Sequence, residues 1–262
     1  MNRYEGKVAV VTASAAGIGR AIVERLIAEG ATVLATSRNG ADALAEEMGE
    51  RCHSLKVDIS SEEQIINMID VAKEKFGKID VAFNVANGAS LGTILGSTAE
   101  EWRVAFDVSV IGTFNCVRHE ARHMIENGVK GAIVNVASLN ADTPARGLSA
   151  YSCAKAAIVM LAKACSIEMA EYGIRVNTLS PGLTKTPVNS EIPEVMEKAF
   201  MDRIPVGRQA TPNEQAEAAL FLGSDQSSYM YGHNLVVDGG WSNSGYPDTR
   251  LWFGPYLNDK LG

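Results

Sequence analysis

Short apolar runs alternate along the chain with segments in which apolar residues recur every three or four positions. The first run, 7–13, is rich in valine, as expected of a strand that is buried on both faces. Further strands are predicted at 31–37, 54–59, 79–86, 131–138, 175–181 and 233–240. After the first strand, apolar residues follow helical spacing from about Gly17 until Gly30, which predicts an amphipathic helix.

Capping signals mark where other helices begin. A serine or threonine followed three residues later by glutamate can satisfy the free N–H groups of a helix N-terminus. The pattern occurs at Ser60 with Glu63, Thr98 with Glu101 and Thr211 with Glu214. It predicts helices from 60 to 76, from 98 to about 127 and from 211 onward, and a further helix is expected from about 150 to 171.

The alternation of strands and helices predicts an α/β fold, in which helices cover both faces of a parallel sheet. Ligands bind such sheets outside the carboxyl ends of the strands. The segments that follow the predicted strands are rich in Gly, Ser, Thr and Asn, among them TASAAGIG, SRN, NVANG, NVASLN and SPGLTKT. We therefore expect the functional site at this edge of the sheet.

Composition narrows the classes of function. The 262 residues are 46% hydrophobic and 21% charged, enough for one large globular domain or two small ones, and the net charge is -7. An acidic chain without basic runs is not expected to bind nucleic acid or an anionic membrane surface. No apolar run approaches the ~18–20 residues that span a bilayer, and the first residues do not resemble a signal peptide.

Cysteine and histidine usage adds little chemistry. The four cysteines show no C-x-x-C spacing, which indicates free thiols in a reducing compartment and predicts a cytoplasmic protein. Only His119 and His123 have a spacing that could suit a metal ion. Arg118 and Arg122 beside them add positive charge, so we expect no metal site.

Two segments point to a dinucleotide. TASAAGIGRAI (12–22) joins the first strand to the first helix, where Gly17 and Gly19 let a phosphate approach the helix N-terminus. At the end of the second strand, where an acid would bind the ribose of NAD, the chain has Ser37 and Arg38. Arginine suits a 2′-phosphate, which favours NADP(H), with NAD(H) as the alternative.

A third group of residues points to acid–base chemistry. Ser138 ends the fifth strand, and Tyr151 and Lys155 lie four residues apart, on one face of the next helix. A lysine ammonium beside a phenol lowers its pKa from about 10 toward neutral pH, where the phenol can act as a general acid or base. A serine hydroxyl could hydrogen-bond the same carbonyl oxygen of a substrate.

In this order and spacing, the motifs resemble those of the short-chain dehydrogenases/reductases of the classical, NAD(P)-dependent type, over about residues 5–241. TASAAGIG is similar to the family's T-G-x-x-x-G-x-G loop, NVAN (84–87) to its N-N-A-G, and Ser138, Tyr151 and Lys155 to its catalytic residues. The resemblance implies a Rossmann-type, doubly wound, seven-stranded parallel sheet in a single domain. It also implies hydride transfer at nicotinamide C4 and a homotetramer (or dimer).

The resemblance further implies which residues bind the cofactor. They are Thr12, Ser14, Gly17, Ile18, Gly19, Ser37, Arg38, Asp58, Ile59, Asn84, Tyr151, Lys155, Pro181, Gly182, Leu183 and Thr186. Three positions depart from the family pattern. Ala13 and Asn87 replace glycines, and Ser109 takes the place of a catalytic asparagine that helps hold a water relaying protons to the lysine. Ser109 is expected to fill that catalytic place, with a shorter reach.

The substrate is less clearly indicated. We expect a nucleotide-binding domain at 1–241, with an apolar substrate lid at about 188–210, and an aromatic C-terminal extension at 242–262 that packs on its own pocket or on a neighbouring subunit. The second half is diffusely similar to bacterial hydroxysteroid dehydrogenases, which implies an oxidoreductase acting on the CH–OH group of a bulky, steroid-like alcohol or on the matching ketone. The alternatives are a 3-oxoacyl thioester reductase and a non-catalytic nucleotide-binding sensor or scaffold.

Overall fold

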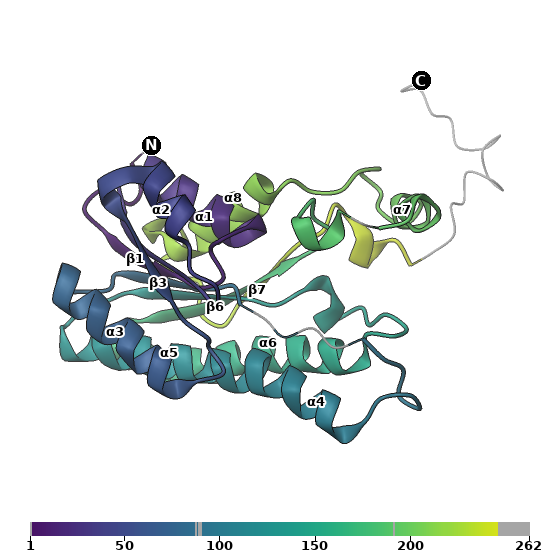
Figure 1. The fold of residues 1–262 in the computed structure, drawn as a ribbon, viewed down its shortest axis with the longest axis horizontal. Helices are drawn as coiled ribbons and strands as arrows, with labels where there is room; N and C mark the ends of the chain where they lie inside the picture. The colour runs from purple at the N-terminus through teal and green to yellow at the C-terminus, as the bar shows by residue number, and fades with distance from the viewer. Residues whose placement is uncertain (1, 87, 89–90, 191, 246–262) are drawn as a thin grey trace.

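The computed structural model describes residues 2–86, 88, 91–190 and 192–245. Within them, seven strands form one sheet in the order β3-β2-β1-β4-β5-β6-β7, and every neighbouring pair is parallel. The strands are β1 (Val8–Val11), β2 (Thr32–Ser37), β3 (Cys52–Lys56), β4 (Val81–Asn84), β5 (Ala132–Val136), β6 (Arg175–Pro181) and β7 (Asn234–Val237). The predicted Rossmann-type, doubly wound sheet is confirmed (Figure 1).

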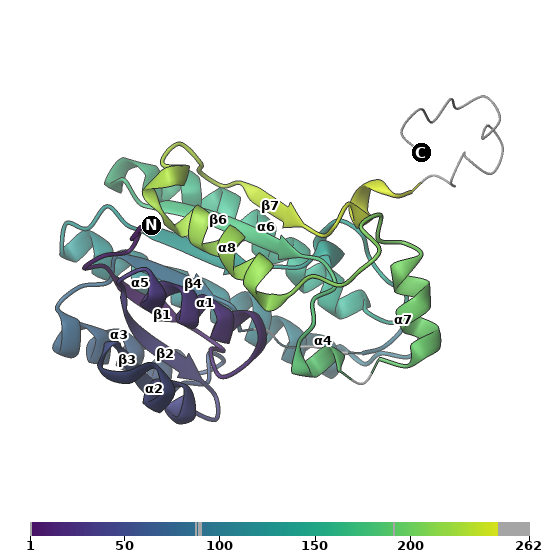
Figure 2. The same cartoon turned by 90° about the horizontal axis from the view of Figure 1, so that it is seen from above.

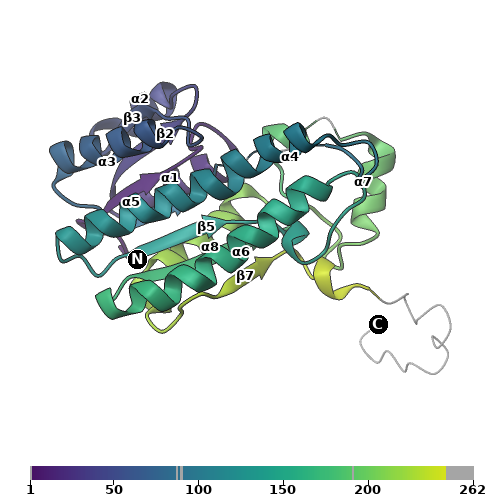
Figure 3. The ribbon, with the colours of Figure 1, turned by 90° about the horizontal axis from the view of Figure 1, so that it is seen from below.

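Helices cover both faces of the sheet (Figures 1 and 3). One face packs against α1 (Gly17–Ala28), α2 (Asp42–Met48) and α8 (Pro212–Gly223), and the other against α3 (Glu62–Phe76), α5 (Gly112–Glu126) and α6 (Ser149–Met169). Helices α4 (Ala99–Phe106) and α7 (Glu194–Met201) lie toward the carboxyl ends of the strands (Figure 2). The sequence pattern did not predict α2, which is short and buries only Leu44.

Alternate residues of each strand hold the two helical layers. In β1, Ala9 and Val11 belong to the core that includes α1 and α8, whereas Val10 belongs to the core with α3 and α5. All three are fully buried, because a central parallel strand has no solvent face. The strand order reverses between β1 and β4, so the loops after these two strands meet at the position where open α/β sheets bind ligands.

Two of the three predicted capping boxes are confirmed, at Thr98 with Glu101 and at Thr211 with Glu214. The third is wrong by one residue. The cap of α3 is Ser61, whose hydroxyl accepts a hydrogen bond from the N–H of Gln64. The hydroxyl of Ser60 instead donates to Asp58 Oδ1 at 2.7 Å, so it is engaged in the turn that precedes the helix.

The predicted long helix after β4 is interrupted. A π-helical turn at Asp107–Ile111 separates α4 from α5, although the chain continues in the helical direction. Such turns hold one extra residue and occur often at functional sites. Ser109 lies at the centre of this turn.

Some predictions concern features that bear little on the site. Over the described residues, no helix combines the length and apolarity that crossing a bilayer requires. Cys52, Cys116, Cys153 and Cys165 are all free thiols, as expected, although Cys153 is exposed. Residues 246–262, which make up most of the predicted aromatic extension, and Asn87 lie outside the described residues.

Candidate active site

Ser138, Tyr151 and Lys155 meet beyond the carboxyl end of β5. Ser138 caps a short 3₁₀ turn, Leu139–Ala141, and α6 carries the other two side chains near its N-terminus. The Ser138 hydroxyl lies close enough to the Tyr151 phenol to lower its pKa, and Lys155 Nζ lies 5.6 Å from the centroid of the Tyr151 ring. The structure thus brings the three predicted residues into one cluster.

Burial governs the charges in this cluster. Lys155 is fully buried, its Nζ donates to the carbonyl of Val136 at 2.9 Å, and burial lowers the pKa of Lys155 to about 7. Burial also raises the pKa of Tyr151, and the hydrogen bond from Ser138 opposes that rise only in part. The expectation that Lys155 lowers the phenol pKa is therefore not met in this structure. A lysine with a pKa near 7 carries only part of a charge at neutral pH.

Ser109 is fully buried and points toward the segment that follows β4. Its hydroxyl is hydrogen-bonded to the backbone N–H and C=O of Gly88. The side chain therefore holds this segment in place, and its part in a proton relay stays a prediction.

The N-terminus of α1 has no side-chain cap. Its N-cap residue is Ala16, and the first turn contains no acidic residue, so the free N–H groups can bind a phosphate oxygen. Gly17 has a φ of 58°, and an added Cβ there would lie 3.2 Å from Cγ2 of Thr186. The glycine loop and the loop after β6 therefore meet, as their predicted roles require.

Several predicted cofactor residues are engaged within the protein. Thr12 Oγ1 accepts hydrogen bonds from the backbone N–H groups of Val85 and Ala86, and Ser14 Oγ donates to the carbonyl of Thr36. The side chain of Asn84 is buried against α5. The buried members of the predicted set are thus Thr12, Ser14, Gly19, Ser37, Ile59, Asn84, Lys155 and Pro181. These side chains position the loops at the edge of the sheet.

The remaining predicted residues are partly or fully accessible at the carboxyl edge of the sheet. They are Gly17, Ile18, Arg38, Asp58, Tyr151, Gly182, Leu183 and Thr186. Gly182 has a further reason to be glycine, because an added Cβ would lie 2.6 Å from Cα of Asp238. The close approach of β7 to the end of β6 depends on this missing side chain.

Arg38 and Asp58 follow the neighbouring strands β2 and β3. Hydrogen bonds from the backbone and hydroxyl of Ser60 lower the pKa of Asp58, and the charge of Arg38 contributes to the same effect. Arg38 is exposed, whereas the hydroxyl of Ser37 donates to the carbonyl of Gly40 at 2.6 Å. Because the hydroxyl of Ser37 is already engaged, only the guanidinium of Arg38 is free to bind a phosphate if one is present.

Comparison with known proteins agrees with this geometry. A family model described as enoyl-(acyl carrier protein) reductase matches residues 12–242. The chain is 34% identical to a 3-oxoacyl-(acyl-carrier-protein) reductase of Thermotoga maritima, over 91% of this chain and 98% of that protein. It is also 34% identical to 3beta-hydroxysteroid dehydrogenase 1 of Eggerthella lenta, over 90% of this chain and 94% of that protein. The chain belongs to the short-chain dehydrogenase/reductase family. A crystal structure of a short-chain type dehydrogenase/reductase from Mycobacterium marinum agrees, with a TM-score of 0.87 and 31% identity over 91% of this chain and 96% of that one.

As a short-chain dehydrogenase/reductase, the protein is an oxidoreductase acting on CH–OH groups with NAD(H) or NADP(H), which sets aside the non-catalytic alternative. The residues present fit such a dinucleotide. The uncapped start of α1 could offer N–H groups to the pyrophosphate, Gly17 leaves its backbone accessible, and Arg38 and Asp58 follow β2 and β3, where the adenosine half is expected. Thr186 lies against Gly17 and would contact the nicotinamide half.

Sequence analysis missed a buried polar network beside the site. Asn84 Nδ2 on β4 donates to Glu120 Oε2 on α5 at 3.0 Å and to Asn135 Oδ1 on β5 at 3.1 Å. Burial raises the pKa of Glu120 to about 7. A signal was available, because Glu120 falls on the apolar stripe of its helix, four residues after the buried Cys116.

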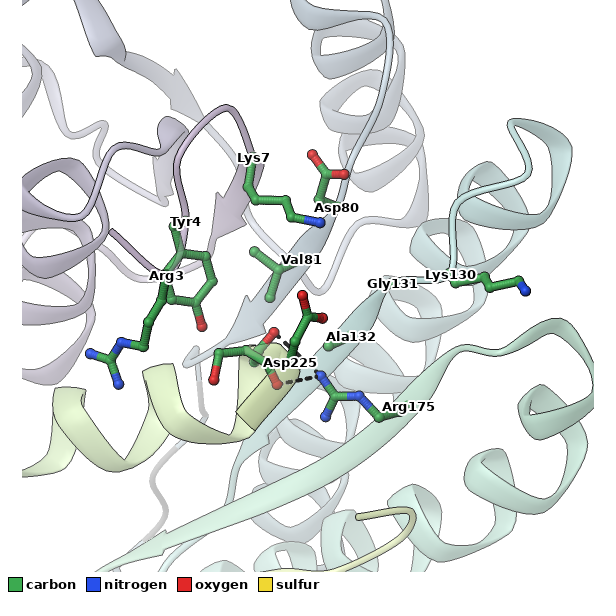
Figure 4. Close-up of a pocket in the computed structure, with 12 residues that line it drawn as sticks. Arg3, Tyr4, Lys7, Asp80, Val81, Lys130, Gly131, Ala132, Arg175 and Asp225 are labelled. Atoms are coloured by element: carbon green, nitrogen blue, oxygen red, sulfur yellow. Dashed lines mark hydrogen bonds between the residues drawn. The ribbon is translucent and has the colours of Figure 1, made fainter. Parts of the chain in front are cut away.

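A polar recess lies at the opposite, amino end of the sheet (Figure 4). Its volume is about 20 Å³, enough for about one water molecule. On one side, Arg175 donates to the carbonyls of Leu222 and Ser224 at 2.8 and 2.9 Å, where α8 ends. This guanidinium satisfies the free carbonyls of a helix C-terminus, so we assign the recess a structural role.

Proposed function

We propose that this protein interconverts a secondary alcohol and a ketone, with NADP(H) as the favoured hydride carrier and a bulky apolar molecule as the substrate. The observation that carries the proposal is the cluster of Ser138, Tyr151 and Lys155, in which a phenol lies between a serine hydroxyl and a buried lysine. The cluster lies at the sheet edge toward which the uncapped N-terminus of α1 opens.

Each residue of the cluster has a distinct task. NADP(H), when bound, supplies or accepts a hydride at nicotinamide C4. During reduction, Tyr151 donates its phenolic proton to the carbonyl oxygen of the substrate, and Ser138 hydrogen-bonds that oxygen as negative charge develops on it. The raised pKa of Tyr151 keeps the phenol protonated, which suits an acid. Lys155, with a pKa of about 7, can return a proton to Tyr151.

Exposed apolar side chains around the site support a bulky apolar substrate. They are Leu91, Ile94 and Leu95 after β4, Val188 after β6, and Val195 and Met196 on α7. The first loop reaches the catalytic helix, because the N–H of Gly92 donates to the carbonyl of Gly147 at 2.8 Å, shortly before α6. A cavity of about 390 Å³ between the loop after β6 and α7 is within the size range of small-molecule sites, although most of its lining residues, such as Lys185, Asn189 and Glu197, are polar.

Reduction of a 3-oxoacyl thioester is the second candidate. The relative from Thermotoga maritima is named for that activity, and it is 34% identical over 98% of its length. A protein carrier for such a thioester would require a basic docking surface, and the net charge of this chain is -7. We therefore favour a free alcohol or ketone as the substrate over a 3-oxoacyl thioester.

We also propose that the protein forms a homotetramer or a dimer. Phe114 on α5 and Met160 and Ile167 on α6 are exposed, on two helices that lie side by side on one outer face (Figure 3). Apolar side chains of this kind are enriched where subunits pack. The mass in solution, measured by light scattering, tests this assembly.

The decisive experiment is turnover by the purified protein. A 3-hydroxysteroid, cyclopentanol and acetoacetyl-coenzyme A would each be offered with NADP(H) and with NAD(H), and nicotinamide absorbance would be followed. We expect the steroid with NADP(H) to give the highest kcat/KM. Tyr151→Phe should lower turnover by about 100-fold or more and leave NADPH affinity unchanged, because only the proton donor is lost. Activity of Tyr151→Phe within about tenfold of the parent would reject the role of the phenol.

A further inference from the structure

The hydroxyl of Ser138 has one hydrogen to donate and two oxygen atoms nearby that could accept it. It accepts a bond from the backbone N–H of Asn140 at 3.1 Å and donates one to Asn140 Oδ1 at 3.3 Å. It also lies beside the phenol of Tyr151, whose pKa it lowers. A serine hydroxyl has a single hydrogen to donate, so Asn140 Oδ1 and the oxygen of Tyr151 compete for it.

The amide of Asn140 is held in one orientation. Its Nδ2 donates to the carbonyl of Thr143 at 3.2 Å, which turns Oδ1 toward Ser138. A flipped amide would set Oδ1 against the Thr143 carbonyl, so this bond fixes which atom faces the serine. The side chain is half-buried, which limits competition from water.

The turn that carries Asn140 is anchored to the sheet. The carboxylate of Asp142 accepts a hydrogen bond from Asn234 Nδ2 at 3.3 Å, and Asn234 Oδ1 accepts one from Ser180 Oγ at 2.7 Å. Asn234 begins β7 and Ser180 lies in β6, so two strands hold the turn in place. The turn that carries Asn140 is therefore fixed to the sheet, and the side-chain oxygen of Asn140 is held facing Ser138.

We propose that Asn140 is the positioning residue for the Ser138 hydroxyl. Its side-chain oxygen holds the serine hydrogen while Tyr151 is protonated and gives it up when the phenolate forms or a substrate oxygen arrives. The bond from the Asn140 N–H to Ser138 Oγ persists in both states and makes the hydroxyl a stronger donor. The proposal rests on the proposed roles of Ser138 and Tyr151.

This arrangement couples Asn140 to the ionisation of Tyr151. Holding the serine hydrogen on Oδ1 favours the phenol, and releasing it to Tyr151 favours the phenolate. Lys155 on α6 is the charged group that contacts the phenol ring, with its Nζ 5.6 Å from the ring centroid. Lys155 stays unchanged in the variants below, and Asn140→Leu and Asn140→Ala add no charge, so a shift of the Tyr151 pKa in these two variants reports on the serine hydrogen.

The test compares Asn140→Leu, which removes the acceptor, with Asn140→Asp, which supplies a stronger one. We expect Asn140→Leu to lower the apparent pKa of Tyr151 and Asn140→Asp to raise it, each by about half a pH unit or more. The pKa is measured as phenolate absorbance, by subtracting the same variant carrying Tyr151→Phe, and as the rising limb of kcat/KM for cyclopentanol oxidation with NADP⁺. Asn140→Ala serves as a second variant without the acceptor, and circular dichroism confirms the fold.

Asn127 offers matched controls, because its Nδ2 also donates to a backbone carbonyl, that of His123, at the far end of α5. Asn127→Leu and Asn127→Asp should leave both measurements unchanged. No shift or a rise in Asn140→Leu and Asn140→Ala would overturn the proposal, whatever Asn140→Asp shows, because the aspartate also raises the Tyr151 pKa through its charge. The absorbance titration needs no substrate, so it tests the role of Asn140 even if Tyr151→Phe shows the proposed function to be wrong.

Discussion

The hydroxyl of Ser109 accepts a hydrogen bond from the N–H of Gly88 at 2.9 Å and donates one to the C=O of the same residue at 3.1 Å. The contact is close, because an added Cβ on Gly88 would lie 2.9 Å from Cβ of Val108. The π-helical turn and the segment after β4 are thereby joined across a stretch of the chain that contains α4. The position at which the family has an asparagine therefore fixes a loop beside the candidate site.

Ser109→Ala should destabilise the protein. The substitution leaves the half-buried N–H and C=O of Gly88 without this partner, which costs about 1 kcal/mol or more. Urea unfolding measures the loss. Ser152→Ala is the matched control, because Ser152 is buried and its hydroxyl has no hydrogen-bond partner within the part of the chain that the structure describes. A Ser109→Ala protein as stable as Ser152→Ala would show that the pair contributes nothing.

Ala13→Gly should leave stability unchanged or raise it by up to about 1 kcal/mol. Ala13 has a φ of 51°, in the left-handed region that disfavours a Cβ, and the family has glycine at this position. Relief of that strain offsets the added freedom of the unfolded chain. Ala15→Gly, two residues later and without a positive φ, relieves no strain and should lower the free energy of unfolding. An Ala13→Gly protein less stable than Ala15→Gly would show that Ala13 is not strained.

Glu120→Gln should flatten the dependence of stability on pH. The pKa of Glu120 rises from an ordinary 4.5 to about 7 in the folded protein. Its contribution to stability is thus complete below the ordinary pKa and is lost as the pH rises through the folded value. The loss is about 1.4 kcal/mol per pH unit and about 3 kcal/mol in total. Thermal unfolding across this pH window measures the slope.

The control for this prediction is Glu126→Gln, which removes an exposed carboxylate from the same helix and should keep the parental slope. Glutamine retains the oxygen that accepts from Asn84, so the hydrogen bond at 3.0 Å can survive the substitution. An unchanged slope in Glu120→Gln would mean that Glu120 is ionised without cost in the folded protein.

Arg38→Ala should weaken NADPH binding by about 10- to 100-fold and change NADH binding little. The guanidinium is exposed beyond β2 and suits a 2′-phosphate, which only NADPH carries. Fluorescence titration gives both dissociation constants. Arg51→Ala removes an equal charge just before β3, at the amino end of the strands and away from the predicted site, and should affect the binding of neither cofactor. Equal losses for NADPH and NADH would count against NADP(H) as the favoured cofactor.

Strand bounds and helix starts were both predicted unevenly. The helix caps Thr98 and Thr211 are as predicted, whereas the strand predicted at 54–59 is β3 (Cys52–Lys56). The strand predicted at 175–181 matches β6 (Arg175–Pro181) residue for residue, because a fully buried strand must be apolar or internally bonded along its whole length. The start of α3 was misplaced by one residue. Ser60 and Ser61 are chemically equivalent in sequence, and only the bond from Ser60 to Asp58 decides which of them is the cap.

The site was predicted unevenly. Side chains whose chemistry is strong and whose spacing is local, such as Tyr151 and Lys155, were found from the pattern alone. The orientation of Asn140 depends on a backbone carbonyl and on the turn that carries it, and neither leaves a mark in a pattern of residue types. The rise in the pKa of Tyr151 depends on burial by the whole fold, which is why local reasoning from Lys155 gave the wrong direction.

The π-helical turn at Asp107–Ile111 also fixes the number of residues between α4 and α5, a property that a deletion tests and a substitution does not. Removing one residue there would restore uniform helical winding, and α4 would rotate by about 100° around its axis relative to α5. The Trp102–Phe106 stack, with ring centroids 6.2 Å apart, would turn with it, and Ser109 would no longer meet Gly88. Surface loops generally tolerate insertions and deletions. A change in the number of residues between the Thr98 cap and Ser109 would instead break the contact between Ser109 and Gly88 beside the site.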